Sequence, residues 1–98
     1  MSMKILIQAH QRLVILRCLS EVPGYDLNES ILQDSLDLYG LDISRDALRT
    51  QLAWLEEQDC ISLKDLSGTQ IATLSNRGID AVNGRATIPG IKRPRPGE

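Results

Sequence analysis

Two amphipathic segments joined by a short glycine turn limit what this chain can fold into. The first segment has Asn28 as its predicted N-cap and Glu29 in its first turn, where an acid suits the helix dipole, and it ends at Gly40. The second segment begins at Ser44, its predicted N-cap. The second carries Leu48, Leu52 and Leu55 at intervals of four and three residues, which places them on one face of a helix. This face is predicted to be buried, so the opposite face of the same helix is predicted to meet solvent or a partner.

A hairpin pattern follows directly. Ile61 and Leu63 alternate with polar residues as in a half-buried strand, Gly68 marks a turn, and a returning strand ends at Leu74. Ser75 then has the character of an N-cap for one more short helix. Helix, turn, helix and hairpin in this order predict a mainly α (α+β) fold, a winged helix-turn-helix with a short two-stranded β-wing.

The length suits one domain. The run 3–19 lacks glycine and proline and predicts a long helix. Its apolar surface is wider than one contact needs, so residues 5–7 either cover the domain's own core or pack against a second subunit. We predict a winged-helix domain over 1–84, with residues 1–20 as a candidate dimerisation helix, and an extended, mobile, basic Pro- and Gly-rich tail over 85–98. A homodimer would add stability to so small a domain.

The core is predicted to be aliphatic. Phe is absent, and the few aromatic side chains are Trp54, Tyr25 and Tyr39. Leu, Ile, Val and Ala must therefore supply most of the buried surface, with these three rings as the only bulky additions to the core.

Charge is distributed unevenly along a chain whose net charge is −2. Residues 1–20 carry three bases and no acid, residues 21–66 carry eleven acids and three bases, and residues 67–98 carry five bases and two acids. Salt screens surface charges beyond about 8–10 Å. A basic surface at one end can therefore attract phosphate even though the chain as a whole is acidic.

The sequence does not indicate a secreted protein, a membrane protein, a metal-binding protein or an enzyme. The chain has no export signal and no apolar run approaching the roughly 18 residues of a membrane helix. Cys18 and Cys60 lack a disulfide or metal spacing, which favours a cytoplasmic protein with reduced thiols. His10 has no acid within one turn, and the acids of residues 56–59 lie along one helix end instead of converging. We therefore predict no enzyme, no catalytic residue, no cofactor and no metal.

The outward face of the helix over residues 44–58 is the candidate DNA-binding site, because the N-terminal half of such a helix enters a major groove. Arg45 and Arg49 lie one turn apart and can each bind guanine O6 and N7 or a phosphate oxygen, and Thr50 can bind a base edge. Small Ala53 allows close approach. A solvated helix face without a ligand is the alternative. The predicted DNA-contacting residues of the helix are Ser44, Arg45, Asp46, Arg49, Thr50 and Ala53.

The wing and the tail are predicted to contact the DNA backbone. Lys64 and Thr69 flank the wing turn, where they can reach phosphates. Lys92, Arg93 and Arg95 form a proline-stiffened basic arm that can lie along phosphates or in a minor groove. A basic tail that only increases solubility is the alternative.

Two segments resemble known families. Residues 44–61 resemble the recognition helix and first wing strand of bacterial winged-helix regulators, and residues 74–78 resemble the entry to the helix after their wing. The whole chain resembles a family of small proteins of Mu-like phages and prophages, chiefly in residues 12–17 and 84–94. The resemblance implies a phage-associated DNA-binding regulator. The chain departs from the pattern at Asp59, where winged-helix sequences commonly have glycine, and in its acidic middle.

Together these features predict a transcriptional regulator that binds double-stranded DNA as a homodimer on a near-symmetric site. Two alternatives remain. One is a winged-helix module without DNA binding, whose acidic middle binds a basic surface of a phage or host protein. The other is a structural or assembly component of a phage particle.

Overall fold

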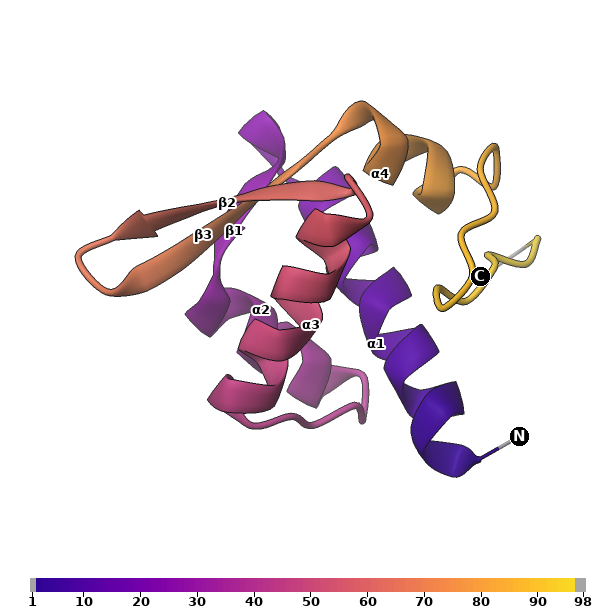
Figure 1. Ribbon diagram of the computed structural model, residues 1–98, viewed down its shortest axis with the longest axis horizontal. Coiled ribbons are helices and arrows are strands. Elements are labelled where there is room, and N and C mark those ends of the chain that lie inside the picture. The colour runs from indigo at the N-terminus through magenta and orange to yellow at the C-terminus, as the bar shows by residue number, and fades with distance from the viewer. Residues whose placement is uncertain (1, 97–98) are drawn as a thin grey trace.

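The structure, a computed structural model, describes residues 2–96 and contains four α-helices and a small sheet within that range (Figure 1). This arrangement confirms the predicted α+β winged helix-turn-helix. The elements in chain order are α1 (Met3–Ser20), a 3-10 turn (Pro23–Tyr25), β1 (Asp26–Asn28), α2 (Glu29–Leu38), α3 (Arg45–Glu57), β2 (Ile61–Leu66), β3 (Thr69–Leu74) and α4 (Asn76–Val82).

Polar side chains set the start of each described α-helix. In every case the residue before the helix has an extended backbone, and its side-chain oxygen accepts a backbone N–H of the first turn. Such a cap typically stabilises a helix by about 1 kcal/mol. The capping residues are Ser2, Asn28, Ser44 and Ser75, which confirms the last three as predicted.

The end of α3 is a left-handed turn at Asp59, whose φ is 60°. Aspartate adopts this conformation more readily than most residues. The Cys60 N–H donates to the Leu55 carbonyl at 3.0 Å, which closes the turn. The next residue, Ile61, therefore enters β2 directly, and the wing lies beside α3.

The sheet has the order β1-β3-β2 and is antiparallel throughout. The β2–β3 wing confirms the predicted two-stranded hairpin, in which Leu66 faces Thr69 across a turn formed by Ser67 and Gly68. Both turn residues have positive φ, as two-residue hairpin loops require. The third strand, β1, was not predicted, because three residues after a Pro-Gly turn are too short to show alternation.

The predicted leucine face of α3 is fully buried at Leu48, Leu52 and Leu55. The prediction that tyrosines join the core is wrong. Tyr25 and Tyr39 are 47% and 62% exposed, because one lies in the turn before β1 and the other ends α2. Buried aliphatic side chains from α1, α2, α3 and the sheet form the core instead.

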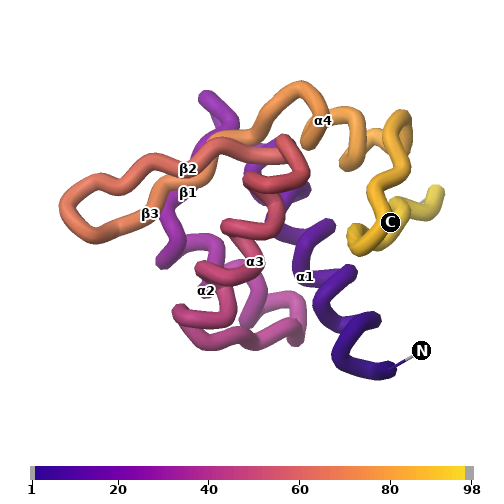
Figure 2. The backbone as a smooth tube through the Cα atoms, viewed as in Figure 1, coloured from indigo at the N-terminus to yellow at the C-terminus, as the bar shows by residue number. Residues whose placement is uncertain are grey.

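The segment after α4 packs against the domain as far as residue 92, and does not extend away from it as predicted (Figure 2). Ile88 is 3% exposed and belongs to the core. The Ile91 N–H donates to the Ile88 carbonyl at 3.0 Å, and the Lys92 N–H donates to the Ala9 carbonyl of α1 at 3.1 Å. The packed core therefore continues past the boundary predicted at residue 84.

The N-terminal end of α1 extends beyond the rest of the domain (Figure 1). Ile5, Leu6 and Ile7 are 57%, 40% and 39% exposed, so they do not cover the domain's own core. No helix of residues 2–96 is both long and apolar enough to cross a membrane.

Candidate nucleic-acid interface

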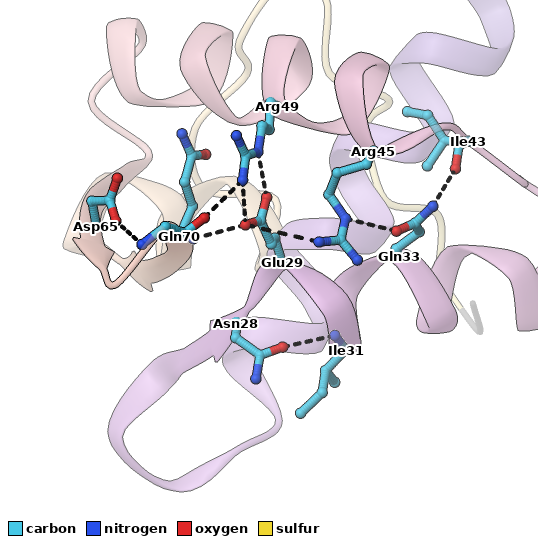
Figure 3. A network of polar contacts seen from close by, with 10 residues as sticks. Asn28, Glu29, Ile31, Gln33, Ile43, Arg45, Arg49, Asp65 and Gln70 are labelled. Atoms are coloured by element: carbon cyan, nitrogen blue, oxygen red, sulfur yellow. Dashed lines mark hydrogen bonds and ion pairs between the residues drawn. The ribbon is translucent and has the colours of Figure 1, made fainter.

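α3 presents two different surfaces beside its buried leucines. Arg45 and Arg49 lie on the flank that faces α2 and the wing (Figure 3). Asp46, Thr50 and Ala53 lie on the outward face and are exposed. The predicted DNA-contacting residues of α3 therefore share one end of the molecule with the wing.

A buried carboxylate, that of Glu29, lies beneath the arginine flank. Glu29 is the first residue of α2 and is 1% exposed. Arg49 donates to it twice, from Nε to Oε1 at 2.7 Å and from Nη2 to Oε2 at 2.8 Å, and the Gln70 N–H donates to Oε2 at 2.9 Å. The Arg49 Nη2 also donates to the Gly68 carbonyl at 3.0 Å. One carboxylate therefore joins α2, α3 and the wing (Figure 3).

The two arginines differ in what they leave for a ligand. Arg49 uses Nε and Nη2 inside the protein, so among residues 2–96 only its Nη1 donates no hydrogen bond. Arg45 donates from Nε to Gln33 at 2.8 Å, and its Nη1 lies 3.9 Å from Glu29 Oε2, beyond hydrogen-bonding distance. The Arg49 side chain is 42% exposed and the Arg45 side chain is 43% exposed. The expectation that both arginines can bind guanine in the same way must be corrected, because the fork of Arg49 already holds Glu29.

The remaining predicted residues of α3 have local partners. The Ser44 hydroxyl accepts the Ala47 N–H at 3.1 Å, and the Thr50 hydroxyl donates to the Asp46 carbonyl at 3.2 Å. Lys64 is exposed on β2, and Thr69 is half-buried at the start of β3. The Ser44 hydroxyl therefore acts as the N-cap of α3, since it already accepts a hydrogen bond from the helix.

The basic residues of the C-terminal segment lie elsewhere. The C-terminal segment that carries them, residues 85–96, lies at the opposite end of the molecule from the wing (Figure 2). The Arg93 Nη1 donates to the Thr87 hydroxyl at 3.2 Å. The structure therefore does not bring this segment together with the wing and the arginine flank of α3.

A second polar network, which the sequence did not reveal, joins α1, α3 and the C-terminal segment. The Arg12 guanidinium lies 3.9 Å from the centroid of the Trp54 ring, and it donates to Gln51 Oε1 at 2.7 Å and to the Gly90 carbonyl at 2.9 Å. Gly90 has a φ of 97°, and a Cβ there would lie 2.8 Å from the Trp54 ring. Only glycine fits this contact, which explains the Pro-Gly turn at residues 89–90.

The Glu29 carboxylate has an unusually low pKa, about 2. The main cause is the pair of hydrogen bonds from Arg49, which burial opposes and the Gln70 N–H reinforces. The pKa of Arg49 is raised by the same contact. Glu29 is therefore ionised at neutral pH and is matched by a fixed positive charge.

This pair predicts acid sensitivity. A group with a lowered folded-state pKa stabilises the fold above its ordinary pKa, here 4.5, and this stabilisation is lost as pH falls towards 2. The full shift corresponds to about 3 kcal/mol. The covering arginines are themselves more than 40% exposed, so solvent screening reduces the expected loss to roughly 1–2 kcal/mol.

Urea unfolding at neutral pH and near pH 3 measures this loss. A Glu29→Gln variant keeps a similar shape but cannot titrate, so its stability is expected to fall less between the two conditions. Equal losses in the two proteins would show that Glu29 does not carry the acid sensitivity.

The sequence of the chain is similar to those of known proteins. The chain is 50% identical over 86 residues to the uncharacterized protein gp26 of Escherichia phage Mu, and the match covers 88% of each chain. It is 56% identical over 78 residues to an uncharacterized protein of Haemophilus influenzae, covering 79% of this chain and 76% of that one. No protein-family model matches the chain.

Solved structures with the same fold include RosR of H. salinarum and Sco3205 of Streptomyces coelicolor. RosR of H. salinarum matches with a TM-score of 0.64 and 23% identity over 74% of this chain and 66% of that one. Sco3205, a MarR family transcriptional regulator from Streptomyces coelicolor solved in complex with DNA, matches with a TM-score of 0.59 and 23% identity over 71% of this chain. The chain spans less than two thirds of either protein, 66% and 42%, and at this identity the likeness shows the fold.

Proposed function

This chain belongs to the family of the gp26 protein of Escherichia phage Mu, and on that premise we propose that it is a phage-associated, DNA-binding regulator of transcription. In this proposal the N-terminal half of α3 enters a major groove and the wing lies along the flanking phosphates. The fold shared with Sco3205, which was solved with DNA, supports the proposed mode of binding.

The main observation in support of this proposal is the position of Arg45 and the contacts that its guanidinium makes. It stands at the first position of α3, with a side chain that is 43% exposed. Its Nε is held by Gln33 and its Nη1 forms an ion pair of 3.9 Å with Glu29, while neither Nη1 nor Nη2 donates a hydrogen bond within residues 2–96. A guanidinium that is oriented at Nε and donates no hydrogen bond from its terminal nitrogens is suited to guanine O6 and N7 or to a phosphate.

Arg49 has a different role in this proposal. Its hydrogen bonds to Glu29 and to the Gly68 carbonyl hold the wing turn at a fixed distance from α3. A wing in a fixed position lets Lys64 and the turn backbone reach phosphates while Arg45 contacts the groove. Asp46, exposed beside Arg45, accepts from cytosine N4 or orients a neighbouring cation.

An Arg45→Ala variant is expected to bind duplex DNA about 10-fold more weakly, because it lacks the α3 guanidinium whose two terminal nitrogens donate no hydrogen bond within residues 2–96. Fluorescence anisotropy with labelled duplexes at several salt concentrations measures this loss. If Arg45 binds phosphate, the slope of affinity against salt falls by about one and all sequences lose equally. If it binds guanine, the loss depends on sequence. Arg85→Ala, an exposed arginine after α4, is the matched control and should bind as the unmodified chain does.

A second function has a specific observation in its favour. The exposed surface of α3 carries Asp46, Glu56 and Glu57, and the charge of Arg49 is balanced by Glu29. Such a surface suits a basic protein partner better than phosphate. A folded chain that shows no salt-dependent DNA binding even at low ionic strength would contradict the DNA-binding proposal and favour this protein-interaction module.

A further inference from the structure

The first two turns of α1 carry a cluster of exposed apolar side chains. Met3 is 67% exposed, and Ile5, Leu6 and Ile7 follow it with exposures of 57%, 40% and 39%. Consecutive positions on a helix point in different directions, so these side chains form a broad apolar arc, and Lys4 and Gln8 lie on the remaining side. A helix end with so wide an exposed apolar face is suited to packing against another surface.

A groove lies directly beside this helix end. It runs between α1 and the N-terminal half of α3 and has a volume of about 530 Å³. Ile7, Ile43, Ala47 and Trp54 form its apolar walls, and Lys4 and Thr50 lie at its edges. Ile7 belongs both to the protruding helix end and to the groove, so the two features form one continuous surface.

We propose that a second copy of this chain fills the groove, with the α1 end of each protomer packed between α1 and α3 of the other. A two-fold axis places the same patch of both subunits in contact, so such a patch must be complementary to itself. A protrusion and a groove that adjoin one another on one surface meet this requirement, because each protomer supplies what the other lacks.

Charge on the two sides is also complementary. Residues 2–20 carry three bases and no acid. The groove itself is lined by Lys4 and Arg12, and Arg12 is already held by Gln51 and Gly90. Asp42 and Asp46 are exposed next to the lining residues Ile43 and Ala47. A two-fold arrangement brings Lys4 of one protomer towards these acids on the other, so the basic helix end of each copy meets acids beside the groove of its partner.

The dimer has a consequence for α3. Thr50 lies at the edge of the groove, whereas Arg45 and Arg49 lie on the opposite flank beside α2 and the wing. A second copy in the groove would therefore remove Thr50 from the predicted DNA-contacting set and leave the arginine flank accessible. Self-association is measured without DNA, so its failure is distinct from failure of the proposed function.

Sedimentation velocity from about 1 to about 100 µM protein tests the proposal, with a dimer of roughly micromolar dissociation constant expected. A Leu6→Glu, Ile7→Glu double variant should be monomeric throughout, since both positions are exposed in the protomer and their replacement leaves its core intact. Leu38→Glu is the matched control, because Leu38 is 87% exposed on α2, away from the groove, and its replacement should leave the dimer unchanged.

The single tryptophan of the chain, Trp54, reports on the groove itself. Its emission should shift to longer wavelength as the unmodified protein is diluted and dissociates, and the double variant should show the longer wavelength at every concentration. A monomer at all concentrations would overturn the proposal. So would a dimer that survives the double substitution, or one that dissociates with no change in Trp54 emission.

Discussion

A Gly78→Ala variant is expected to lose about 3 kcal/mol of its free energy of unfolding, because the added methyl group has no space. Gly78 is buried in α4, where a Cβ would meet the Cys60 carbonyl oxygen and lie 2.5 Å from Leu74 Cδ1. The Cys60 carbonyl cannot easily move, since it accepts the Ser75 N–H at 3.0 Å at the start of the same helix. The structure thus gives a physical reason for the glycine of the segment 74–78.

Thermal and urea unfolding measure this effect, and the midpoint temperature should fall by more than about 10 °C. Asn76→Ala, at the exposed first position of α4, is the matched control and should change stability by no more than about 0.5 kcal/mol. A Gly78→Ala variant as stable as this control would show that α4 does not pack against Cys60 as described.

An Ile88→Ala variant is expected to lose about 2–4 kcal/mol, the usual effect of removing a large aliphatic side chain from a core. Ile88 is 3% exposed although it follows the last helix by several residues. The loss would show that the winged-helix domain includes the segment packed on α1, and that a domain ending at residue 84 is incomplete.

The neighbouring Thr87 provides the control, because it is exposed and a Thr87→Ala change removes no core contact. Urea unfolding of both variants separates the two effects. If Ile88→Ala proved as stable as Thr87→Ala, the C-terminal segment would contribute nothing to the fold, and the boundary predicted at residue 84 would stand.

Local patterns in the chain were enough to predict most of the fold. Asn28, Ser44 and Ser75 cap the helices that they were expected to cap, and the leucines at 48, 52 and 55 are all fully buried. These features depend on residues three or four positions apart, which is the distance over which a helix brings side chains together. The left-handed turn at Asp59 was indicated differently, by a position where winged-helix sequences commonly have glycine.

The candidate site was predictable only in part. Arg45 and Arg49 were identified as residues on the non-leucine side of α3, but not the difference between them. That difference depends on Glu29, which is twenty residues from Arg49 in the chain and was expected only to favour the start of α2. No spacing rule links the two, because the close approach of α2, α3 and the wing creates the contact.

The sequence by itself determined the order and type of the elements, the inward face of α3 and the family to which the chain belongs. Only the tertiary structure decided which arginine forms the two hydrogen bonds to Glu29, that Ile88 joins the core, and that residues 5–7 remain uncovered. The physical reason is the distance along the chain over which each interaction acts. Capping and helical periodicity act between near neighbours in the chain, whereas ion pairing and burial depend on which distant segments pack together.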